Sequence, residues 1–105
     1  MNIGNVPYLI HSVSKEESRL FHVWQSMNYR CNHKNDPSYK NYGGRGITIE
    51  WQSFIEFKND MLASFAKHRS RYPHNTSIER KNVNGNYSKL NCCWATKQQQ
   101  NKNRR

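Results

Sequence analysis

The stretch SIERKNVNGNYSKLNCCWAT, residues 77–96, holds two short apolar runs on either side of a polar loop. Asn84-Gly85 lies inside this loop, and Asn-Gly is a strong turn former between two strands. The nine residues that follow, KQQQNKNRR, are polar and basic, and Thr96 before them is a residue type that caps helices. The pattern predicts two short antiparallel strands, a loop of about ten residues between them, and a helix packed across the pair.

Two amphipathic helices are predicted upstream of that stretch. Residues 14–33 begin with Ser14 and Glu17 at the spacing of a capping box. Apolar residues then recur along one face of this helix: Leu20, Trp24, Met27 and Cys31. In residues 51–68 a second apolar face combines Trp51, Phe54, Ile55, Met61, Leu62 and Phe65.

Between the two helices lies a polar segment rich in turn formers, residues 32–46. We expect it to be an ordered loop, because Tyr39 and Tyr42 can anchor it. ITIE, residues 47–50, is a candidate short strand. At 105 residues the chain is predicted to be one α+β domain. It has a loose arm over residues 1–13, a helical scaffold with the YGGRG loop over 14–72, and the strand–loop–strand–helix unit over 74–105.

The charge is concentrated in the C-terminal part of the chain. Residues 1–66 carry seven Lys or Arg and six Asp or Glu, whereas residues 67–105 carry ten Lys or Arg and one acid, Glu79. This asymmetry predicts a polyanionic partner, nucleic acid before membrane, and a merely solvated surface is the simpler alternative. We find no leader and no apolar run of about 18 residues, and the three cysteines lack paired spacing. The composition therefore favours a reduced, cytoplasmic protein without a membrane span.

Residues 77–96 and the following QQQNKNRR resemble the HNH nuclease superfamily. They are closest to a small phage and bacterial branch that follows roughly the pattern sldRidn-GnYspeNcrWaT…Q-nNrr. The earlier YKNYGGRGITIEWQSFIEFKNDM is similar to the same branch, so the resemblance covers about residues 20–105. It implies a C-terminal ββα-metal motif and a phage-encoded, metal-dependent endonuclease that nicks or cuts duplex DNA in the bacterial host cell. Because one site cuts one strand, a double-strand cut requires a homodimer or two events.

The resemblance also implies a metal site. Glu79 would supply the carboxylate for a divalent cation, Mg²⁺ or Mn²⁺ first, since hard cations prefer oxygen ligands. The second ligand falls on Gln100, and Asn101 is the near alternative because helix boundaries shift by a residue or two. Asn91 corresponds to the central asparagine of HNH sites, which braces the loop. Arg80 stands where the family has its first histidine. A guanidinium cannot act as a base, so Arg80 is expected to contact a phosphate.

The general base is open between two residues. Tyr87 is the tyrosine that the branch shares, and its phenol would act as a base only if Arg80 and a metal lowered its pKa. His74, five residues before Glu79, is the competing base. Glu79 replaces the usual aspartate, and Asn82 replaces the second aspartate of the RID pattern. The alternative prediction is therefore a degenerate HNH fold that binds nucleic acid or a host enzyme without cutting.

Several cations are candidates for contact with nucleic acid: Arg45, Lys81, Lys89, Lys97, Lys102, Arg104 and Arg105. Gly43 and Gly44 allow the backbone to approach a phosphate closely beside Arg45, and a tight turn is the equal alternative. A structural zinc is not expected, because neither Cys31-x-His33 nor Cys92-Cys93 has typical ligand spacing. Small buried apolar side chains are the simpler explanation of the cysteines.

Overall fold

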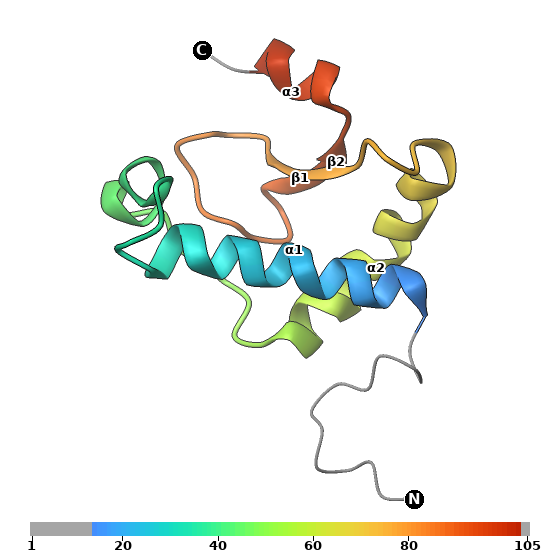
Figure 1. Ribbon diagram of the computed structural model, residues 1–105, viewed down its shortest axis with the longest axis horizontal. Coiled ribbons are helices and arrows are strands. Elements are labelled where there is room, and N and C mark those ends of the chain that lie inside the picture. Colours follow the sequence, from blue (N-terminus) through green and yellow to red (C-terminus); the bar gives the residue numbers. More distant parts are fainter. Residues whose placement is uncertain (1–13, 104–105) are drawn as a thin grey trace, which may run out of the picture.

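The computed structural model describes residues 14–103, so the arm predicted at 1–13 and the predicted contacts Arg104 and Arg105 lie outside the described residues. The elements in chain order are α1 (Lys15–Asn32), the 3₁₀ turns η2 (Tyr39–Asn41) and η3 (Gly43–Arg45), α2 (Phe54–Arg71), β1 (Ser77–Arg80), β2 (Cys92–Ala95) and α3 (Lys97–Asn103). β1 and β2 pair antiparallel, so the chain is an α+β protein, as predicted. Figure 1 shows α1 crossing the molecule, with the strands and α3 above it.

The first helix begins and packs as predicted. Ser14 Oγ accepts a hydrogen bond from the backbone N–H of Glu17 at 3.0 Å, which satisfies one free donor of the first turn. The carboxylate of Glu17 lies 3.0 Å from Lys58 Nζ and so ties the start of α1 to α2. Leu20 and Met27 are fully buried on the predicted face.

The second helix begins three residues later than the pattern indicates. Ser53 Oγ caps it by accepting from the backbone N–H of Glu56 at 3.3 Å, so the first helical residue is Phe54. Trp51 precedes the helix but is still buried, and its indole Nε1 donates to Asp60 Oδ2 at 2.8 Å. The tryptophan thus joins the core from the loop.

One apolar cluster forms the core, and it draws on both long helices, the loop after η3 and the hairpin: Leu20, Met27, Cys31, Ile47, Trp51, Phe54, Phe57, Met61, Phe65, Tyr87, Cys92 and Trp94. The prediction of Ile55 in the core is wrong, because this residue is 52% exposed, and Phe57 is fully buried instead. The rings of Phe65 and Trp94 lie 4.7 Å apart, which fixes β2 on α2.

The YGGRG segment is ordered, as expected, and consists of tight turns. A Cβ atom at Gly43 would overlap the carbonyl oxygen of Cys31 and the ring of Tyr39. Only glycine allows this segment to pass so close to the end of α1. Gly46 follows with a φ of 88°, a left-handed conformation that also favours glycine.

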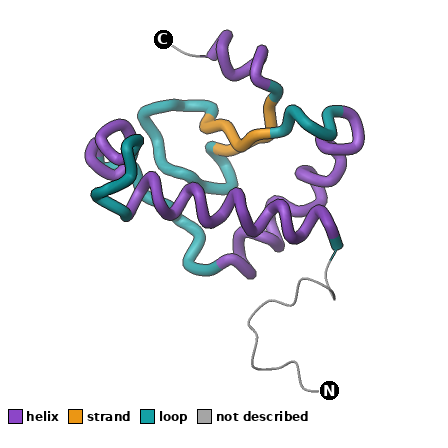
Figure 2. The backbone as a smooth tube through the Cα atoms, viewed as in Figure 1, coloured by secondary structure: helices purple, strands orange, loops and turns teal. Residues whose placement is uncertain are grey.

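The segment over residues 47–50 does not form the predicted strand. It makes one parallel bridge, between Ile49 and Tyr87, with hydrogen bonds of 3.0 Å from Tyr87 N to Thr48 O and 2.8 Å from Glu50 N to Tyr87 O. Because the partner segment is the curved hairpin loop, the pairing ends after this bridge. It nevertheless attaches the YGGRG segment to the loop over residues 81–91, which extends well beyond the short strands in Figure 2.

The strand–loop–strand–helix order predicted for the C-terminal part is present. In the strand register Glu79 pairs with Cys93, and Arg80 pairs with Cys92. Successive side chains of a strand point to opposite sides of the sheet, so Glu79 and Arg80 point to opposite sides. Thr96 caps α3 reciprocally with Gln99, by hydrogen bonds of 2.8 and 3.2 Å. None of the helices in residues 14–103 combines the length and apolar composition of a membrane span.

Candidate functional site

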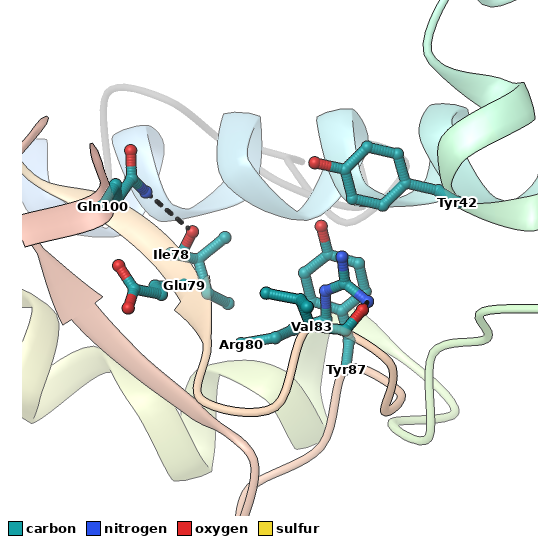
Figure 3. A pocket seen from close by; sticks show the side chains of 7 residues that line it. All are labelled: Tyr42, Ile78, Glu79, Arg80, Val83, Tyr87 and Gln100. Atoms are coloured by element: carbon teal, nitrogen blue, oxygen red, sulfur yellow. Dashed lines mark hydrogen bonds between the residues drawn. The ribbon is translucent and has the colours of Figure 1, made fainter. Parts of the chain in front are cut away.

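A pocket of about 170 Å³ opens between β1, the hairpin loop, α3 and the loop that contains YGGRG. Its lining residues are Tyr42, Ile78, Glu79, Arg80, Val83, Tyr87 and Gln100 (Figure 3). Four of these are residues that the sequence singled out: Glu79, Arg80, Tyr87 and Gln100. Figure 3 shows the Glu79 carboxylate and the Gln100 amide at one end of the pocket, and Arg80 with the two tyrosine rings at the other.

The carboxylate of Glu79 is the most unusual group in the pocket. Its Oε1 atom is buried and has no hydrogen-bond partner among the described residues. Burying a carboxylate oxygen without a donor is costly, because the hydration of the charge is lost. Gln100 lies beside it and holds α3 on β1, since its Nε2 donates to the carbonyl of Ile78 at 3.2 Å.

Glu79 and Gln100 offer two oxygen donors in this pocket, fewer than the full shell of a hard cation. Within residues 14–103, no group of three or more His, Cys, Asp or Glu side chains is placed to hold a metal. Glu79 contributes one carboxylate and Gln100 one carboxamide. Mg²⁺ commonly binds through one or two carboxylates while water and substrate phosphates complete its shell. The residues present therefore fit such a cation, bound jointly with a phosphate.

Arg80 closes the hairpin loop by donating hydrogen bonds to loop carbonyls. The side chain is buried, with 9% of its surface exposed, and its Nη1 donates to the carbonyls of Val83 at 2.6 Å and Gly85 at 2.9 Å. The guanidinium carbon lies 5.0 Å from the Tyr42 ring centroid and 5.2 Å from that of Tyr87. The phosphate contact expected of Arg80 thus competes with a role in holding the loop.

Tyr87 does not have the properties of a base. It is 3% exposed, and its hydroxyl oxygen accepts a hydrogen bond from Arg30 Nη2 at 3.0 Å. Burial raises the pKa of the Tyr87 phenol above its ordinary value, and the opposing effects of Arg30 and Arg80 do not offset this. Arg80, one of the two cations expected to lower this pKa, does not bring it below its ordinary value. The phenol stays protonated at neutral pH.

Arg30 and Tyr42 belong to this site, although the sequence analysis assigned them no function. Arg30 comes from the end of α1 and lies 5.1 Å from the Tyr42 ring centroid and 5.7 Å from that of Tyr87. The two tyrosine rings stack with centroids 6.2 Å apart. We call Arg30, Tyr42, Arg80 and Tyr87 the Arg–Tyr cluster. In the sequence, only the expected role of Tyr42 as a loop anchor pointed to the Tyr42 and Arg30 part of this cluster, because Arg30 and Tyr87 are 57 residues apart.

Asn91 ties the two ends of the hairpin loop together from outside the pocket. Its Oδ1 accepts from the backbone N–H of Asn82 at 2.9 Å. Its Nδ2 donates to the carbonyls of Asn82 at 3.1 Å and Asn86 at 2.9 Å. These three bonds shape the loop that carries Tyr87, so any catalytic effect of Asn91 acts through loop geometry.

His74 and Asn101 do not line the pocket around Glu79. His74 is exposed and lines a neighbouring hollow, together with Lys97 and Gln100. Asn101 is exposed on α3. Gln100 is therefore better placed than Asn101 to act with Glu79.

The predicted nucleic-acid contacts fall into different environments. Arg45 Nη2 donates to Asn84 Oδ1 at 2.6 Å and so pins the YGGRG turn to the hairpin loop. Lys89 Nζ lies 3.7 Å from Asp60 Oδ1. Lys97 lines the hollow that contains His74, and two further lysines are exposed: Lys81 and Lys102. The cations chosen from sequence do not all share one environment.

Comparisons of the chain with protein-family models, with curated proteins and with solved structures found no match. The resemblance to HNH nucleases therefore rests on the sequence pattern alone. The function is inferred from the chemistry of the pocket and from the charge around it.

Proposed function

We propose that the chain is a metal-dependent DNA endonuclease of the HNH type, in which β1, β2 and α3 serve as the ββα-metal motif. The observation that carries the proposal is the buried Oε1 of Glu79, which has no partner among the described residues and lies beside Gln100. A divalent cation would offset the cost of burying this oxygen. The excess of Lys and Arg in residues 67–105 supports a polyanionic substrate.

In this proposal Glu79 holds Mg²⁺ or Mn²⁺, and the side chain of Gln100 is the second protein group within reach. The bound cation would supply charge stabilisation at the scissile phosphate. Arg80 and Asn91 hold the hairpin loop in shape by their bonds to loop carbonyls. With the Tyr87 phenol protonated, the remaining one of the two predicted bases is His74, in the hollow beyond Gln100, which would accept the proton of the attacking water.

Relaxation of supercoiled plasmid in Mg²⁺ or Mn²⁺ tests the proposal. Glu79→Gln keeps the size of the side chain but removes the charge that would hold the cation, so it should abolish cleavage and leave DNA binding intact. Mn²⁺ should raise the melting temperature of the wild type and not that of the variant, because a ligand stabilises only the state that binds it. Glu56→Gln is the matched control, since Glu56 accepts from Gln52 N at 2.9 Å on α2 and glutamine can retain this bond.

Two outcomes would overturn the proposal. The first is a Glu79→Gln variant that cuts as fast as the wild type, which would remove the metal assignment. The second is a wild type that shifts DNA in a gel but relaxes no plasmid with Mg²⁺, Mn²⁺, Co²⁺ or Ni²⁺.

The second outcome corresponds to the alternative function, a nucleic-acid-binding or host-enzyme-binding module. A specific observation favours it: no imidazole of residues 14–103 lines the Glu79 pocket, and the Tyr87 phenol has a raised pKa. Such a module would keep the fold and the basic surface without the chemistry. For the nuclease, a double-strand cut would additionally require a homodimer, which sedimentation of the complex with DNA can detect. Either function would be exercised in the host cytoplasm.

A further inference from the structure

Two larger hollows adjoin the Glu79 pocket. One, of about 550 Å³, lies between α1, the end of α2 and the start of α3, and the other, of about 380 Å³, runs along α1 and β1. They share Val23, Thr76 and Ser77, and Gln100 lines both of them and the Glu79 pocket. The three hollows therefore form one groove, which we call the α1–α3 groove.

Outside the Glu79 pocket, the charged residues that line the groove are all cations. The larger hollow is lined by three cations, Arg19, Arg69 and Lys97. Within residues 14–103, no Asp or Glu lines either of the two larger hollows. Arg69 is mostly buried and is held by Glu16, at 3.3 Å from its carboxylate, and by the carbonyl of Pro73 at 3.2 Å. Arg19 and Lys97 are exposed and make no ion pair with the residues that the structure describes.

We propose that one strand of the nucleic-acid substrate lies in the α1–α3 groove, with its phosphates against Arg19, Arg69 and Lys97. The inference rests on the proposed function in one respect: the strand is led past Gln100 to Glu79, where it would be cut. The binding itself requires only the groove. Phosphates are the anions that match a row of cations, and Ser77 adds a hydroxyl donor of the kind that positions a sugar–phosphate backbone.

Phosphate contacts of this kind make binding tolerant of sequence and sensitive to salt. Each Lys or Arg that neutralises a phosphate releases counterions, so the logarithm of the affinity falls linearly with the logarithm of the salt concentration. Lys34 provides the contrast, because it is exposed and lies outside the lining of the groove. Lys40 is likewise exposed and outside the groove.

The test is the fluorescence anisotropy of a labelled duplex oligonucleotide, titrated with the full chain in EDTA at several salt concentrations. We expect Arg19→Gln with Lys97→Gln to weaken binding about tenfold or more and to reduce the salt slope by about two. The control pair, Lys34→Gln with Lys40→Gln, removes the same charge and should change the affinity less than about threefold. Thermal melts monitored by circular dichroism establish that both double variants are folded.

The outcomes separate this inference from the proposed nuclease activity. If the control pair weakens binding as much as the groove pair, or if neither pair weakens it, the groove is not the path of the strand. If the groove pair alone loses affinity while the wild type cuts no DNA with any divalent metal, the groove assignment stands and the nuclease proposal fails.

Discussion

Replacement of Tyr87 by phenylalanine removes one oxygen atom and separates a structural role of this residue from a catalytic one. The hydroxyl oxygen accepts the hydrogen bond from Arg30 Nη2 at 3.0 Å inside a buried cluster. Arg30 Nε is already buried without a partner among the described residues. The variant therefore deprives a half-buried cation of an acceptor that the surrounding residues are poorly placed to replace.

The expected loss of stability follows from this contact. A hydrogen bond to a charged group contributes about 1.5–3 kcal/mol, and the ring of the variant can still stack on Tyr42, so packing adds little. For a domain of this size the melting temperature should fall by about 6–20 °C. Urea unfolding followed by circular dichroism measures the free energy. Tyr29→Phe is the control, because Tyr29 is 55% exposed, and it should change stability by less than about 0.5 kcal/mol.

The same variant tests the chemistry in the plasmid assay. Because burial raises the pKa of the Tyr87 phenol, this group is protonated at neutral pH and we expect the folded variant to cut within about threefold of the wild-type rate. A folded variant that loses about a hundredfold in rate would identify the phenol as the base and refute the reasoning. A stability loss no larger than that of Tyr29→Phe would show that the bond to Arg30 contributes nothing.

Three further predictions concern the loops and the core. Asn91→Ala removes three hydrogen bonds that close the hairpin loop and should lower the free energy of unfolding in urea by about 2–4 kcal/mol, whereas Asn101→Ala should have almost no effect. Gly43→Ala should cost more than about 3 kcal/mol or prevent folding, because its Cβ would overlap a backbone carbonyl, and an effect no larger than that of Gly44→Ala would contradict the assigned close approach. Burial raises the pKa of Cys92 from 9.0 to about 11, so the neutral thiol is favoured in the folded state. The contribution of Cys92 to the free energy of unfolding is fully present below pH 9. It should fall by about 2–3 kcal/mol as the pH rises to 11. Equal pH dependence in Cys92→Ala would refute this.

The elements that depend on near neighbours in the chain were predictable. The face of α1, its cap at Ser14, the two strands around the Asn-Gly loop and the cap of α3 at Thr96 all follow from the spacing of residues within a few positions. The pattern at residues 77–96 also singled out Glu79 and Gln100, which the fold brings into one pocket. The excess of cations in the C-terminal part required only counting.

The tertiary structure decided what depends on contacts between distant segments. Periodicity placed Ile55 in the core, yet Phe57 is the buried residue, with its ring against Trp24 of α1 and against Trp51. Arg30 meets Tyr87 across 57 residues, and burial in this cluster raises the pKa of the phenol, which was one of two candidate bases. The α1–α3 groove exists only where α1, the end of α2 and α3 meet, and its cation Arg19 was assigned no role from the sequence. Sequence spacing reports which side chains share a face of one element, whereas burial, pKa and charge at a site depend on which elements meet.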